Sequence, residues 1–324
     1  MNLVSAELVA VVATVADGEP LVLASGEPAA LPHGPLEPEH RSLQAGMRAW
    51  AAEQTGHELG YAEQLYTFAD RGRSGAADRS VAISYLALTH RQTDASAWNP
   101  WYVHLPWEDR RSATGIALAG QLAEPLRAWA EADPGLAPLR RERVAHAFGL
   151  GGDPWRPELA LHRYELLWEA GLVAESAPDR GAAGGTAAGA ADSERAGSGI
   201  PAGDRGRSEV AASGMPMLHD HRRILATGVA RLRSMLQYRP VIFELVPEEF
   251  TLGQLQTCVE ALAGQVVHKQ NFRRLVEQQH RLVEPTGAVA RNTGGRPARL
   301  YRYRSEVFRE RRHVGTKLPL PRST

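Results

Sequence analysis

The chain has 324 residues, and its 37 Lys and Arg side chains balance its 37 Asp and Glu side chains. The length suffices for two domains, and a hydrophobic fraction of 43% allows packed cores. The one cysteine, Cys258, excludes an intrachain disulfide and favours the reducing cytoplasm. We expect neither a signal peptide nor a membrane span, because no stretch approaches roughly 18 uninterrupted apolar residues.

The N-terminal segment predicts an α+β domain with helices packed on a mixed sheet. Asp17-Gly18 is a hairpin signal between two short apolar strands, and Gly56 can end an amphipathic helix. Residues 80–89 are apolar enough for a strand buried on both faces. The predicted strands cover residues 8–23, 61–68 and 80–89, and the predicted helix covers residues 41–54.

Asp70-Arg71-Gly72-Arg73, between the last two strands, is the candidate ligand-binding loop. The guanidinium groups of Arg71 and Arg73 offer the paired hydrogen bonds that suit a diphosphate. The alternative is a solvated loop with two surface arginines. The aromatic cluster from Trp98 to Trp107 offers either a stacking surface for adenine or a packed core or interface cluster. Residues 110–172 predict helices that complete this domain or its dimer contact.

Residues 174–213 are rich in Gly, Ala and Ser, and we expect disorder because such a segment buries too little apolar surface. Residues 219–238 predict a helix whose apolar stripe packs on the N-terminal domain or on a second copy of itself. His219 and His221 resemble metal ligands, but residues two apart on a helix do not face each other. We therefore expect no metal site.

The last third predicts three short helices and a two-stranded wing, the pattern of a winged helix-turn-helix. Thr251 and Gln254 form a capping box at the start of the second helix, and Gly264 can end it. The third helix begins at Lys269. The first helix is expected at residues 240–245, and the two strands at residues 282–284 and 299–303.

The third helix has the sidedness of a groove-reading helix, although a surface helix with a solvated basic face is the alternative. Its apolar stripe consists of Phe272, Leu275 and Val276, and its opposite face of Gln270, Arg274 and Glu277. Arg pairs with guanine edges, and Gln and Asn pair with adenine edges. The candidate DNA contacts are Lys269, Gln270, Asn271, Arg273 and Arg274 on the helix and Arg296 and Arg299 in the wing.

The charge distribution supports this assignment. Residues 214–324 hold 19 Lys and Arg against 9 Asp and Glu, whereas the remaining residues hold 18 against 28. Basic surface on a phosphate backbone gains from counterion release, so the C-terminal third is where DNA is expected.

Several motifs resemble one family, the Nudix-related transcriptional regulators of NAD metabolism (NrtR). In the first half they are Glu53 to Gly56, Gln64 to Arg73 and Ser80 to Thr89, which resemble a Nudix domain. In the second half they are His219 to Leu225, Leu232 to Leu236, Phe243 to Leu252, Asn271 to Leu275 and Gly295 to Tyr303, which resemble the family's linker helix and winged helix. The resemblance implies ADP-ribose or a related nucleotide as effector and no required cofactor.

The chain departs from the Nudix enzyme pattern. A working Nudix box holds Mg²⁺ with clustered carboxylates. Aligning the box to Gly56 places Arg41, Trp50, Glu53 and Gln54 at the four carboxylate positions. Aligning it to Gly34 places His40, Ala49, Ala52 and Glu53 there. Either alignment keeps one carboxylate, Glu53, so we expect hydrolysis to be lost or very weak and no metal to be bound.

The predicted protein is a cytoplasmic, homodimeric repressor of NAD biosynthesis or salvage genes that binds a palindromic operator in double-stranded DNA. One alternative is an active Nudix pyrophosphohydrolase acting on ADP-ribose or a similar nucleotide with Mg²⁺, and another is a winged helix that binds proteins. The expected parts are a Nudix-like α/β/α sensor domain (1–173), a low-complexity linker (174–214), a linker helix (215–238), a winged helix-turn-helix (239–312) and a tail (313–324).

Overall fold

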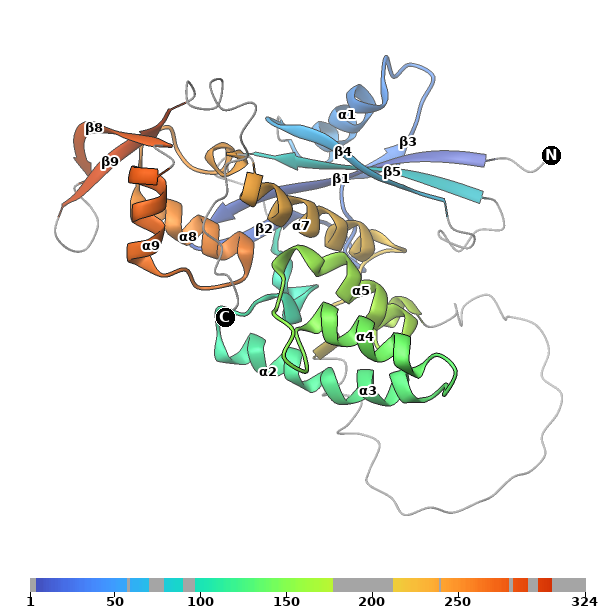
Figure 1. The fold of residues 1–324 in the computed structure, drawn as a ribbon. Helices are drawn as coiled ribbons and strands as arrows, with labels where there is room; N and C mark the ends of the chain where they lie inside the picture. The colour runs from blue at the N-terminus through green and yellow to red at the C-terminus, as the bar shows by residue number, and fades with distance from the viewer. Residues whose placement is uncertain are drawn as a thin grey trace, which may run out of the picture.

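The computed structural model describes residues 4–56, 59–69, 79–89, 97–176, 212–238, 240–279, 282–290 and 297–304. A six-stranded sheet organises the N-terminal part and a three-stranded sheet the C-terminal part (Figure 1). The predicted α+β class is therefore confirmed. Within these ranges, no helix is both long and apolar enough to cross a membrane.

The six-stranded sheet is built around β1 (Val4–Ala16), which lies parallel to β5 (Arg79–Leu88) and antiparallel to β2 (Glu19–Leu23). The predicted hairpin is confirmed, because Asp17 and Gly18 have φ values of 53° and 78°, as a tight turn between twisted strands requires. The strand before this turn is longer than predicted, since its pairing with β5 begins at Val4. The sheet order is β4-β5-β1-β2-β6, with β3 (His33–Pro35) on β1; β4 is Ala62–Phe68 and β6 is Trp98–Pro100.

Helices cover both faces of this sheet (Figure 1). The α1 helix (Leu43–Thr55) packs on one face with Leu8, Ala10 and Val12 of β1, and α7 (His221–Tyr238) packs on the other with the alternate residues. The apolar stripe of α7 is fully buried against the sheet, so the first of the two predicted packing modes is the one observed. Its members are Leu225, Val229, Leu232 and Leu236.

A helical layer lies beyond α7 (Figure 1), as predicted for residues 110–172. Its α5 helix packs directly on α7, and α4 and α3 lie farther out. The helices are α2 (Ala113–Gln121), α3 (Ala123–Glu131), α4 (Ala137–Phe148) and α5 (Ala160–Glu169), with 3₁₀ turns η1 (Trp101–Val103), η2 (Pro106–Glu108), η3 (Pro157–Leu159) and η4 (Ala174–Ser176).

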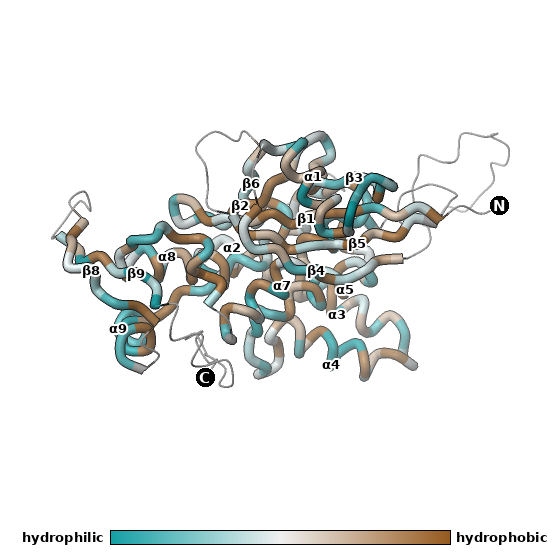
Figure 2. Tube along the Cα trace, turned by 90° about the horizontal axis from the view of Figure 1, so that it is seen from above, coloured by the Kyte–Doolittle hydropathy of each residue, from teal (hydrophilic) through white to brown (hydrophobic). Residues whose placement is uncertain are grey.

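The C-terminal part is a winged helix at the end of the molecule away from the N-terminus (Figures 1 and 2). The capping box between Thr251 and Gln254 and the left-handed Gly264 (φ 68°) bound α8 (Leu252–Ala263), as predicted. The helix expected at 240–245 is a 3₁₀ turn, η5 (Val241–Glu244), followed later by α9 (Lys269–Arg273) and the π-helical turn η6 (Arg274–Gln279).

The wing differs from the prediction in two respects. It has three strands rather than two, because β7 (Phe250–Thr251) joins it in the order β7-β9-β8. The strand β8 (Val283–Ala290) also runs past Pro285 and pairs with β9 (Ala298–Tyr303) across a register shift. Proline is tolerated there because β8 is an edge strand.

Candidate functional site

The first candidate site is the exposed face of α9. Phe272 and Val276 are 0% exposed and anchor the helix in the core of the winged helix. The predicted DNA contacts on the opposite side all face solvent: Lys269, Gln270, Asn271, Arg273 and Arg274. The structure thus has the apolar anchor and the polar reading face that a groove-reading helix needs.

The residues that continue this helix depart from the predicted division into an apolar and a polar face. Glu277, expected on the polar face, is only half exposed, and its carboxylate accepts a hydrogen bond of 2.7 Å from the Tyr301 hydroxyl. The cause is the π-helical turn from Arg274, because i→i+5 bonding turns each residue through a smaller angle than an α-helix does. Tyr301 was missed from the sequence, although the period of two along β9 places it on the same face as Arg299.

These elements frame a groove between the start of α8, α9 and β9, lined by Lys269, Arg273, Glu277 and Arg299 among others. Arg299 is exposed on β9, so the structure brings this predicted wing contact together with the helix contacts. Three cationic side chains around one carboxylate leave the groove positively charged, which suits a phosphate backbone. The predicted contact Arg296 lies outside the described residues.

The second candidate site is α1, the helix that the sequence analysis aligns with a Nudix box. Glu53 is exposed near its C-terminal end. Trp50 donates from its indole nitrogen to the Pro35 carbonyl (2.9 Å), and its ring covers Gly34 so closely that an added Cβ would lie 2.3 Å away. Gln54 donates to the His33 carbonyl (2.6 Å) and accepts from its N–H (3.1 Å). Two positions that would carry carboxylates in the Gly56 alignment therefore hold the helix to β3.

The candidate nucleotide loop cannot be placed, because Asp70, Arg71 and Arg73 lie outside the described residues. The aromatic cluster is placed. Trp101 and Trp107 are 1% and 0% exposed and belong to the main hydrophobic core, so they pack rather than stack a base.

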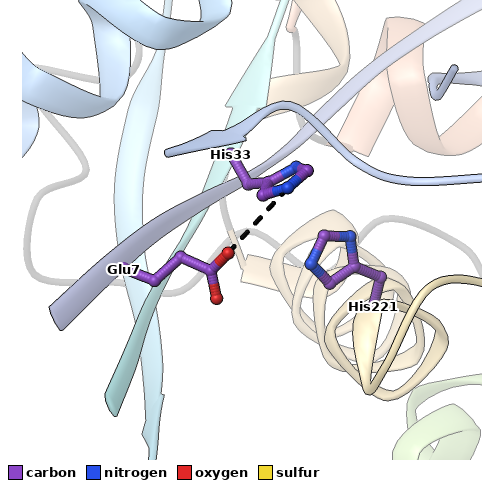
Figure 3. A group of neighbouring side chains, drawn as sticks. All are labelled: Glu7, His33 and His221. Atoms are coloured by element: carbon purple, nitrogen blue, oxygen red, sulfur yellow. Dashed lines mark ion pairs between the residues drawn. The ribbon is translucent and has the colours of Figure 1, made fainter. Parts of the chain in front are cut away.

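One group of three residues in the described part has metal-ligand chemistry: Glu7, His33 and His221, from β1, β3 and α7 (Figure 3). Their ligand atoms lie within 4.8 Å of one another, and His33 Nε2 is 4.0 Å from the Glu7 carboxylate. However, His221 Nδ1 accepts the Leu31 N–H (3.1 Å), so neutral His221 carries its proton on Nε2. That nitrogen then has no lone pair for a metal in this tautomer.

Residues 242–303 match the family model of the NrtR DNA-binding winged helix domain. The C-terminal domain is therefore similar to the DNA-binding domain of NrtR proteins. The ADPR responsive transcriptional repressor NtrR of Acinetobacter baylyi is 34% identical over 89 residues, which is 28% of this chain. The match spans about a third (35%) of the length of that relative.

One solved structure shares this fold over most of the chain. The crystal structure of Shewanella oneidensis NrtR aligns over 93% of this chain and 95% of that one, with a TM-score of 0.50 and 20% identity. A MutT/nudix family protein from Enterococcus faecalis aligns over 94% of this chain and 88% of that one, with a TM-score of 0.47 and 13% identity. The chain combines a Nudix-like domain with an NrtR-type winged helix.

Proposed function

We propose that the protein is a transcriptional repressor that binds double-stranded DNA through α9 and the wing. The observation that carries this proposal is the set of exposed polar side chains between Lys269 and Arg274, on a helix anchored by the buried Phe272 and Val276, within an NrtR-type winged helix. We infer a homodimer, because two recognition helices one helical turn apart read a palindromic operator. The proposed targets are genes for NAD biosynthesis or salvage, and the proposed location of the protein is the cytoplasm.

The proposed effector is ADP-ribose or a related nucleotide, bound to the Nudix-like domain. The Acinetobacter relative is named as responsive to this nucleotide. Binding would shift the population of dimer geometries and so change the fit of the two helices to adjacent grooves. The Asp70–Arg73 loop is the proposed contact. Calorimetry with an Arg71→Ala/Arg73→Ala variant tests it, and unchanged affinity for ADP-ribose would remove the loop from the proposal.

The DNA-binding function is tested by capturing genomic fragments on the purified chain and measuring affinity for the enriched duplex. Gln270→Ala and Arg274→Ala should weaken specific binding more than non-specific binding, whereas Arg299→Ala should weaken both and reduce the dependence on salt. Arg127→Ala, at an exposed position on α3, is the matched charge control. A wild-type chain without salt-dependent affinity for any duplex refutes the proposal.

We also propose that the Nudix-like domain has lost hydrolysis, because either alignment of the box keeps only Glu53, and in the Gly56 alignment Trp50 and Gln54 tether α1 to β3 where carboxylates would be needed. Incubation with ADP-ribose and Mg²⁺ or Mn²⁺ should give no turnover. Robust turnover that Glu53→Gln abolishes would instead establish the chain as a hydrolase.

A further inference from the structure

The C-terminal end of α8 is capped by residues from outside the winged helix. The last carbonyls of a helix lack partners within it and need donors from elsewhere. Here the donors come from the segment between β6 and α2 and from α7. They are the Tyr102 hydroxyl to the Ala261 carbonyl (2.6 Å), Arg233 Nε to the Leu262 carbonyl (2.9 Å) and the Arg110 N–H to the Gly264 carbonyl (2.8 Å).

A buried ionic network fixes this capping point. The Glu108 carboxylate accepts hydrogen bonds from both Arg163 and Arg233, and all three side chains are 0% exposed. Burial opposes ionisation of Glu108, but the two guanidinium groups outweigh it and hold its pKa below the ordinary value. Glycine at position 264 allows the end of α8 to approach Glu108 closely, because a Cβ there would lie 2.3 Å from the Glu108 carbonyl oxygen. A network of this kind satisfies its charges in one arrangement and therefore favours a single orientation of α8.

The same segment is attached to the six-stranded sheet. Its β6 end pairs with β2, and Arg111 near its other end donates to the Gly18 carbonyl (2.6 Å) in the β1–β2 turn. Arg111 also lies over the Tyr102 ring, with 5.2 Å between its guanidinium carbon and the ring centroid. The segment from Trp98 to Arg111 thus connects the Nudix-like sheet to the helix on which α9 packs.

We infer that Tyr102, Glu108 and Arg233 are positioning residues through which the N-terminal domain sets the orientation of the DNA-reading helix. The inference rests on the proposed function and deepens it. The effector acts on the sheet side of the segment, and the orientation of α8 and α9 changes on the other side. Operator affinity therefore depends on this contact, whereas affinity for non-specific DNA, which needs only exposed cations, does not.

The test uses the full chain with Tyr102→Phe, which removes one hydroxyl and keeps the buried ring. Affinities for the captured operator and for an unrelated duplex are measured with and without ADP-ribose. The effect of ADP-ribose is expressed as the ratio of the operator affinities in the two conditions. We expect this ratio to fall by about fivefold, the factor that corresponds to the net contribution of one hydrogen bond. Non-specific affinity should stay unchanged. Tyr66→Phe, at a 62% exposed position, is the control and should keep the wild-type ratio.

Arg233→Lys supplies a second variant, because an ammonium keeps the charge beside Glu108 and loses the fork that reaches Leu262. It should lower the ratio as Tyr102→Phe does. A wild-type ratio in both variants overturns the inference and leaves the proposed function intact. A wild-type chain that binds no operator, or whose binding ignores ADP-ribose, overturns both.

Discussion

Glu108 is the residue whose replacement should be most costly to the fold. One carboxylate serves Arg163 and Arg233, and none of the three side chains is exposed to solvent. In Glu108→Gln the two guanidinium groups stay buried and lose the counter-charge that they share. Removing one partner of a buried ion pair costs about 3–5 kcal/mol, and two stranded cations place this variant at the upper end of that range.

The measurement is denaturant-induced unfolding followed by tryptophan fluorescence and by circular dichroism. The matched control is Glu169→Gln, which breaks a bidentate pair with Arg143 whose side chains are 38% and 40% exposed. Pairs this exposed contribute at most about 1 kcal/mol. Equal losses of unfolding free energy in the two variants would refute the view that burial makes the Glu108 network contribute more to stability than an exposed ion pair does.

Three further outcomes follow from the same contacts. The pKa of Glu108 lies below its ordinary value of 4.5, so its contribution to stability is complete above pH 4.5 and is lost as the pH falls through the lower folded-state pKa. In an acid titration, the difference in unfolding free energy between wild type and Glu108→Gln should therefore shrink below pH 4.5. Gly264→Ala should unfold more easily than Gly56→Ala, because both glycines have φ 68° but only the first meets the Glu108 backbone; equal denaturation midpoints would contradict this. Gly34→Ala should displace the Trp50 ring and change its fluorescence without changing operator affinity; an unchanged emission spectrum would show that the ring has room.

Local signals in the sequence predicted much of the fold because each has a local physical cause. Asp17-Gly18 adopts the positive φ values that a hairpin turn demands, and Thr251 and Gln254 satisfy each other's backbone at the start of α8. Gly56 and Gly264 end their helices in the left-handed conformation that other residues adopt at a cost. Features decided within about four residues could thus be predicted.

Features that depend on residues far apart in the sequence could not be predicted. Glu108 lies 55 residues from Arg163 and 125 from Arg233, and charged residues ordinarily indicate surface. The π-helical turn from Arg274 has no local signal, yet it moves Glu277 from the polar face toward Tyr301. The two-residue strand β7 is likewise too short for a pattern and is defined only by its pairing with β9.

The α1 helix, which the sequence analysis aligns with a Nudix box, connects these observations to the proposed function. Clustered carboxylates repel one another until a divalent cation joins them, so a working box makes local order depend on metal. In α1, Trp50 and Gln54 instead make neutral hydrogen bonds to the backbone of His33 and Pro35. The helix is then held in place without an ion. A protein proposed to report the level of a nucleotide needs a pocket that retains the molecule rather than consumes it, and a metal-independent α1 meets that requirement.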